Sequence, residues 1–188
     1  KKPIAMGGDE LVLIKDDAFE DMAAFPTVMS LVAAINKIGE YDLILCGRQA
    51  SDHDQSQVPY GIAEMLGLPV ISMAADVQLS EGAVRVERKL PDGYEVLEAP
   101  LPAVVSVSNE LNPVRYPNLR GIMQASRKQP TVWGLSDLEM DPAVFQKGLE
   151  LQDLFVPVSE KVCEFIEGED DEDTGRKLAL RLREAKLI

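Results

Sequence analysis

Residues 41–69 read YDLILCGRQASDHDQSQVPYGIAEMLGLP, an order in which an apolar run ends in a polar loop that leads directly into a helical pattern. The apolar run 43–46 is typical of a strand that is covered on both faces in a parallel sheet. Gly47 then permits a sharp exit from the strand. After the loop, apolar residues recur at helical spacing, and these are Val58, Ile62, Met65 and Leu66.

The junction between this strand and helix is a candidate anion site. The first N–H groups of a helix lack intrahelical partners and carry partial positive charge, so a nucleotide phosphate fits there. We expect Asp54, Gln55 and Ser56 to cap or open the helix. An ordinary capped turn explains the same pattern, so these residues alone leave a phosphate site and a structural turn equally open.

Strands and helices alternate in the first part of the chain, which predicts an α/β fold with a doubly wound, mostly parallel sheet. Between residues 76 and 99 polar and apolar residues alternate across two turn signals, Glu81-Gly82 and Pro91-Asp92-Gly93. This alternation predicts an antiparallel meander. The other predicted elements are strands at 11–14, 43–46, 70–73, 103–107 and 131–135, and helices at 27–38, 56–66 and 174–187.

Composition excludes several function classes. The 188 residues are 46% hydrophobic, and without an apolar run of roughly 18 residues we expect no membrane insertion. The net charge of −13 argues against nucleic-acid binding. The two cysteines, Cys46 and Cys163, lack metal-ligand spacing, and no signal-peptide pattern stands at the start, which favours a cytoplasmic location. The acidic run 167–173 predicts the solvated start of the last helix.

Catalysis by this chain alone is not expected. His53 stands between Asp52 and Asp54, but no nucleophile is spaced with these residues in a recognisable catalytic pattern. Neither a GxxxxGK[ST] run nor a GxGxxG fingerprint is present. Loop residues that hydrogen-bond to backbone or to a nucleotide explain the three residues better.

Two long blocks resemble the β subunit of electron transfer flavoproteins. Residues 47–58, GRQASDHDQSQV, resemble the nucleotide loop of that family, and residues 101–128, LPAVVSVSNELNPVRYPNLRGIMQASRK, resemble its strand and partner-recognition loop. The segment 5–14, AMGGDELVLI, resembles a third part of the family. Members of the family begin with a further strand and helix, and that strand is central in their sheet. By the resemblance we expect this strand to be missing from the chain or supplied by another chain.

The resemblance implies an electron carrier of two subunits and no enzyme activity in this subunit. In such proteins the α subunit holds FAD, which accepts electrons from a flavin-dependent dehydrogenase such as an acyl-CoA dehydrogenase and passes them to a quinone oxidoreductase or another acceptor. The β subunit holds AMP or, in electron-bifurcating members, a second FAD. The ligand-binding residues implied here are Gly47, Arg48, Gln49, Ala50, Ser51, Asp52, His53, Asp54, Gln55, Ser56, Gln57 and Val58.

The end of this loop bears on which ligand is bound. Ser56-Gln57-Val58 stands where AMP-binding members commonly carry Asn-Gln-Thr, and Gln-Val followed soon by proline resembles the FAD-binding type. His53 and Pro59-Tyr60 match neither pattern. The resemblance therefore leaves AMP and a second FAD open.

A docking site is implied by the second block. Leu119 matches the leucine that projects from the recognition loop 115–124 into an apolar pocket on partner dehydrogenases. Burial of such an aliphatic anchor contributes about 1 to 2 kcal/mol. An ordinary helix start with an apolar face is the alternative, and it stays open. The implied docking residues are Arg115, Tyr116, Leu119, Ile122 and Met123.

The predicted organisation is a nucleotide-binding α/β domain at residues 1–137, incomplete at its N-terminus, followed by an arm and helix at 138–188 that pack on the α subunit. The alternative function is an adenine-nucleotide sensor module, similar to universal stress proteins, without electron transfer. Such a sensor needs neither the block 101–128 nor the C-terminal arm. We therefore favour the electron carrier.

Overall fold

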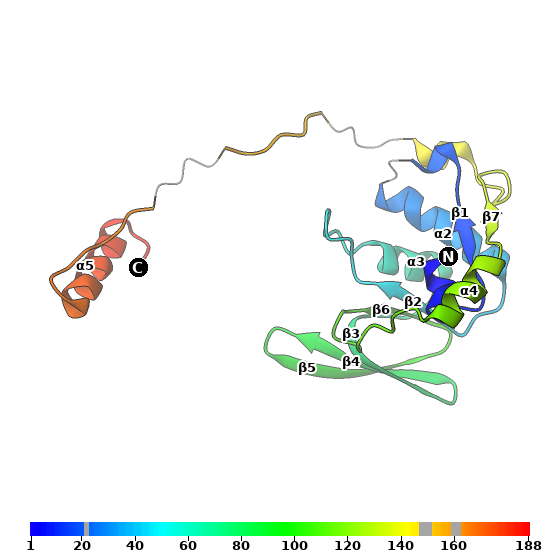
Figure 1. The fold of residues 1–188 in the computed structure, drawn as a ribbon, viewed down its shortest axis with the longest axis horizontal. Helices are drawn as coiled ribbons and strands as arrows, with labels where there is room; N and C mark the ends of the chain where they lie inside the picture. Colours follow the sequence, from blue (N-terminus) through cyan, green and yellow to red (C-terminus); the bar gives the residue numbers. More distant parts are fainter. Residues whose placement is uncertain (21–22, 147–151, 159–162) are drawn as a thin grey trace. The chain divides into compact units, whose positions relative to one another are not determined.

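The computed structural model describes residues 1–20, 23–146, 152–158 and 163–188. The chain divides into two compact units, Lys1–Glu150 and Leu151–Ile188, each of which is described here by itself (Figure 1). The predicted roles of residues 1–137 and 138–188 stay predictions.

A five-stranded sheet with the strand order β2-β6-β3-β4-β5 forms the centre of the first unit. β6 lies between β2 and β3 and is parallel to both, whereas β4 and β5 continue the sheet as an antiparallel meander. This arrangement confirms the predicted α/β class and the predicted meander. The strands are β2 (Leu43–Gly47), β3 (Val70–Ser80), β4 (Ala83–Leu90), β5 (Gly93–Pro100) and β6 (Ala103–Val107).

Strand β6 separates two apolar clusters. Val104 packs with residues of the helices α2 (Ala24–Ile38) and α3 (Val58–Leu66). Its neighbour Val105 packs with the inner residues of the meander, because successive side chains of a strand point to opposite faces. A strand buried on both faces reads as a continuous apolar run, which is why the predicted bounds of β6 match the observed ones.

Strand β3 differs from its predicted form. The sequence predicts a strand at 70–73 and a separate meander from residue 76, but the structure has one strand through both. Its register shifts between Ala74 and Asp76, and Met73 adopts a left-handed φ of 58°. This bulge lets β3 leave its parallel partner β6 and continue beside the antiparallel partner β4.

The first and last predicted strands of the domain form a separate sheet. β1 (Val12–Ile14) and β7 (Thr131–Trp133) pair in parallel and do not join the five-stranded sheet. β7 ends two residues before the predicted bound at Leu135, whose N–H is held by Asp16 Oδ2 instead. The expectation of a further central strand, missing here or supplied by another chain, stays a prediction.

Helices pack on the sheet, and a contact between two helices joins the start of the chain to the block 101–128. α2 begins at Ala24, three residues before the predicted start, because Pro26 is tolerated in a first helical turn. The short helix α1 (Lys2–Ala5) contacts α4 (Leu119–Arg127), and a Cβ on Gly121 would lie 2.4 Å from the Ala5 carbonyl oxygen. The described residues of this unit also form the 3-10 helices η1 (Asp17–Phe19) and η2 (Pro142–Phe145).

The second unit contains α5 (Asp171–Glu184), which begins and ends three residues before the predicted bounds. Its start is stabilised by Asp170, whose side chain accepts a hydrogen bond of 2.8 Å from the Asp173 N–H. This confirms the predicted acidic helix start. Leu178 of this helix is 45% exposed within this unit. In the described residues we find no helix that is both long and apolar enough for a membrane span.

Replacement of Gly61 tests the contact between α2 and α3, which lie side by side in Figure 1. A Cβ at Gly61 would lie 2.6 Å from a methyl group of Val28, a side chain that is stiff in a helix. We expect Gly61→Ala to lower the free energy of unfolding by about 1 to 3 kcal/mol in urea denaturation. Val28→Ala removes the methyl groups that clash. Gly61→Ala should therefore lower the free energy of unfolding less in a chain that already carries Val28→Ala than in the unmodified chain. A Gly61→Ala variant as stable as the unmodified chain would contradict the packing described.

Candidate functional site

A cavity of about 310 Å³ lies where the parallel strands β2 and β6 end. Their ladder pairs Gly47 with Val107, so the loops that follow both strands leave the sheet at the same edge. Ligands of open α/β sheets bind at the carboxyl ends of such strands. The residues that line the cavity are Arg48, Gln49, Ser51, Asp54, Val107, Ser108 and Asn109.

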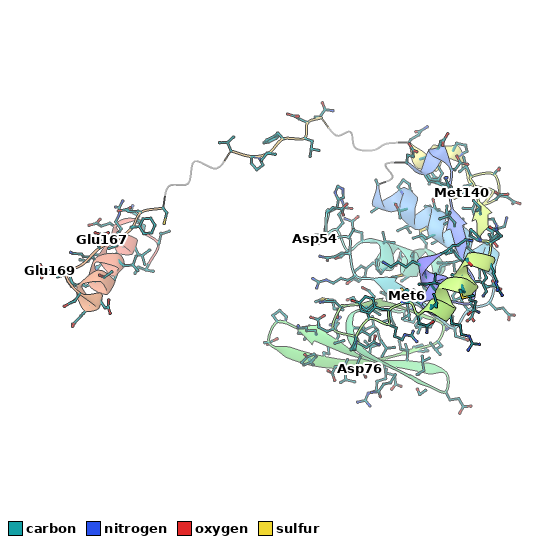
Figure 2. The ribbon with its side chains drawn as sticks, in the orientation of Figure 1. Met6, Asp54, Asp76, Met140, Glu167 and Glu169 are labelled. Atoms are coloured by element: carbon teal, nitrogen blue, oxygen red, sulfur yellow. The ribbon has the colours of Figure 1, made fainter. Side chains whose placement is uncertain are left out.

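Gln49 holds the loop of the first strand in a defined shape. Its side-chain Nε2 donates a hydrogen bond of 2.6 Å to Asp54 Oδ1, and its Oε1 accepts one from Ser56 Oγ. Asp54 and Ser56 both adopt left-handed backbone angles, with φ of 49° and 54°. Such angles are uncommon outside glycine, so the side-chain contacts of Gln49 help to stabilise them. Figure 2 labels Asp54 in this loop.

The predicted cap of the following helix is wrong. α3 begins at Val58, two residues later than predicted, and its N-cap is Gln57, which makes no side-chain capping bond. Asp54 and Ser56 are unsuited to a cap because they are engaged with Gln49. Pro59 lies in the first turn, where a missing N–H is tolerated. The start of α3 therefore has no side-chain acceptor from the N-cap residue.

Only part of the predicted ligand loop reaches the cavity. Of the residues 47–58, four line it, namely Arg48, Gln49, Ser51 and Asp54. Gly47 ends β2, Gln57 and Val58 begin α3, and Asp52 accepts a hydrogen bond from the His53 N–H at 2.9 Å. Ala50 accepts a 2.9 Å bond from the Asp54 N–H, while Gln55 and Ser56 complete the loop beside it. The ligand roles of all twelve residues stay predictions.

The sequence interpretation missed the second side of the cavity. Val107, Ser108 and Asn109 follow β6, which pairs with β2 although some 60 positions separate the two strands. The sequence did carry a signal for them. Residues 43–46 and 103–107 both have the pattern of buried parallel strands, and the polar residues just after two such strands can meet at one edge of the sheet. Arg48 is the cationic side chain among the lining residues, which favours an anionic ligand.

Other chemistry at the site is limited. Burial raises the pKa of the Cys46 thiol in β2, which favours the protonated thiol at neutral pH. Within the described parts of the chain, no cluster of three or more His, Cys, Asp or Glu residues could hold a metal ion. A second cavity of about 310 Å³ is lined by Ile4, Asp9, Lys128 and neighbouring residues. This cavity lies where the parallel strands β1 and β7 begin and not at their carboxyl ends, so we assign the candidate site to the first cavity.

The predicted docking residues lie at the start of α4 and just before it. Asn118 caps this helix by accepting a 2.8 Å hydrogen bond from the Gly121 N–H. Leu119 thus begins a helix, but the apolar residues of this start do not pack as a core face, and the docking role stays a prediction. Leu119 is 75% exposed, and Ala125 is the buried residue of the helix. The other docking residues, Arg115, Tyr116, Ile122 and Met123, are also accessible.

Comparison with known proteins identifies the family. The model of the electron transfer flavoprotein domain matches residues 1–138. The caffeyl-CoA reductase-Etf complex subunit CarD of Acetobacterium woodii is 34% identical over 188 residues, covering 98% of this chain and 72% of that protein. The electron transfer flavoprotein subunit beta of Thermoanaerobacterium thermosaccharolyticum is 39% identical over 142 residues, covering 75% of this chain and 54% of that protein.

The residues matched by the family model include β2 and the polar loop that follows it. The match extends through the segment that contains α4 and its exposed leucine. The chain therefore belongs to the electron transfer flavoprotein family, in which it is of the β-subunit type.

Proposed function

We propose that this chain is the β subunit of a heterodimeric electron transfer flavoprotein and binds an adenylate group in the cavity at the ends of β2 and β6. The observation that carries the proposal is the cavity itself, where Arg48 from the nucleotide loop and the residues after β6 meet at one sheet edge. The adenylate is either AMP or the AMP part of a second FAD.

The lining residues fit an adenylate by their chemistry. The Arg48 guanidinium suits a phosphate, because it donates two parallel hydrogen bonds to neighbouring oxygens. Ser51, Ser108 and Asn109 offer hydroxyl and amide groups for ribose and base, and Val107 offers an apolar contact. A bound FAD would supply electron transfer at its flavin ring, whereas AMP would supply none.

The volume of the cavity bears on the choice of ligand. At about 310 Å³ it lies at the small end of the usual range for ligand sites. This size suits a mononucleotide, so the remainder of an FAD would extend beyond the cavity. We propose the adenylate as the common element, and the electron-bifurcating role depends on a flavin there.

The proposed assembly includes an α subunit that holds FAD, a flavin-dependent dehydrogenase such as an acyl-CoA dehydrogenase, and a quinone oxidoreductase or another acceptor. Relatives carry names of an electron transfer flavoprotein subunit and of a complex subunit, which supports a role within a complex. The second unit offers an apolar segment for the α subunit, in which Leu154, Phe155, Val156 and Val158 are exposed. A nucleotide sensor needs no such segment, so we favour the carrier.

Two free cysteines, Cys46 and Cys163, fit the proposed cytoplasmic location.

Replacement of Arg48 tests the adenylate site. We expect Arg48→Ala to raise the dissociation constant for AMP about tenfold, because a charge-assisted pair with the phosphate is lost. Isothermal calorimetry with the full chain measures this constant. Arg85→Ala is the matched control, since Arg85 is an exposed arginine of β4 that does not line the cavity. Equal affinity of both variants for AMP would contradict the assignment.

Replacement of Leu119 tests the docking surface on α4. Leu119→Ala should slow electron transfer from the dehydrogenase about 5-fold to 30-fold, the equivalent of about 1 to 2 kcal/mol of lost apolar contact. Heterodimer formation and flavin content should remain unchanged. Leu79→Ala, at another exposed leucine on β3, serves as the control. If Leu119→Ala and the control transfer electrons at the rate of the unmodified protein, Leu119 is not a docking residue.

A further inference from the structure

The second side of the candidate cavity is held by the bulge of β3. The Ser108 N–H and the Ser108 hydroxyl each lie 3.1 Å from the Ala74 carbonyl oxygen. Ala74 is the residue at which the register of β3 shifts, next to the left-handed Met73. The chain after β6 is therefore fixed to the point where β3 changes partner from β6 to β4.

A second contact fixes the same segment to the meander. Lys89 Nζ on β4 lies 2.7 Å from Glu110 Oε1, and both side chains are partly exposed. The hydrogen bond from Lys89, followed by one from Ser108, lowers the pKa of Glu110 from its usual value of 4.5 to about 2. Glu110 raises the pKa of Lys89 in turn. Glu110 is thus ionised at neutral pH, and its ion pair joins Lys89 to the segment that contains Ser108, a cavity residue.

The path from the meander to the cavity is short. Glu110 directly follows Asn109, and one residue separates it from Ser108; both Ser108 and Asn109 line the cavity. The Ser108 hydroxyl has a single proton and lies within reach of both the Ala74 carbonyl and the Glu110 carboxylate. Loss of the Lys89 contact would free Glu110 and allow residues 108–110 to shift. Small displacements of binding groups reduce ligand affinity.

We propose that Lys89 and Glu110 are positioning residues for the nucleotide cavity, whose ion pair holds residues 108–110 so that Ser108 and Asn109 can contact the adenylate. Neither residue lines the cavity. The inference rests on the adenylate site proposed above, and it adds a link between that site and the meander.

The chain offers a matched control for this ion pair. Arg88, the neighbour of Lys89, forms a salt bridge with Glu95 across the β4–β5 ladder. That pair joins two strands of the meander to each other and does not involve residues 108–110. Glu95→Gln therefore removes a second ion pair of β4 without changing a residue of the segment at the cavity.

The test measures the affinity of the full chain for AMP by calorimetry at neutral pH. Lys89→Met and Glu110→Gln should each raise the dissociation constant about threefold to fivefold, the range of a partly exposed ion pair. The double variant should be no weaker than either single one, because both remove the same contact. Exchange of the charges, Lys89→Glu with Glu110→Lys, should restore binding to within about twofold. Glu95→Gln should bind AMP as the unmodified chain does.

Two outcomes overturn the inference. One is an unmodified chain that binds AMP while Lys89→Met and Glu110→Gln bind it equally well. The other is an equal loss of affinity in Glu95→Gln, which would indicate a general effect of the meander. If the unmodified chain and Arg48→Ala both fail to bind AMP, the proposed adenylate site itself is wrong, and the positioning role falls with it.

An NMR titration of Glu110 reports on the ion pair without any ligand. In the unmodified chain the Glu110 carboxyl should titrate near pH 2, and in Lys89→Met its pKa should rise toward 4.5. The stabilisation from the pair is present above the unfolded pKa of 4.5 and is lost as the pH falls toward 2. A Glu110 pKa of 4.5 in the unmodified chain would show that the pair does not form and would overturn the inference.

Discussion

The parallel pairing of β2 with β6 is the constraint on which the candidate site depends. This ladder runs from Leu43 opposite Ala103 to Gly47 opposite Val107. Two loops from distant parts of the sequence therefore leave the sheet side by side at the same edge. β6 is fixed because it is buried against the helices on one face and against the meander on the other. A shift of this strand by one residue would exchange the two faces and expose apolar side chains to solvent.

Around this fixed edge, polar contacts set the shape of the two loops. Gln49 holds Asp54 and Ser56 on the side of β2, and the Ala74 carbonyl holds Ser108 on the side of β6. The sheet supplies the positions, and these side chains supply the orientation of the binding groups.

The sequence predicted the parts of the fold that depend on local patterns. The run 103–107 is apolar except for Ser106 and buried except for its last residue, so its bounds were predicted correctly. Ser56 was wrongly predicted as a cap, because a left-handed angle and a contact with Gln49 leave no trace in residue spacing. Ser108 and Asn109 were missed as cavity residues for a related reason. Their place beside Arg48 comes from pairing between strands that are far apart in the sequence.

The most direct test of the account is to find where an adenylate binds on the chain. Photocrosslinking of the full chain with 8-azido-AMP, followed by peptide mass spectrometry, locates the bound base. We predict that the label attaches within residues 48–54 or 107–109 and that excess AMP and excess FAD both suppress it. Labelling elsewhere, or labelling that neither competitor reduces, would contradict the assignment of the cavity at the ends of β2 and β6 as the nucleotide site.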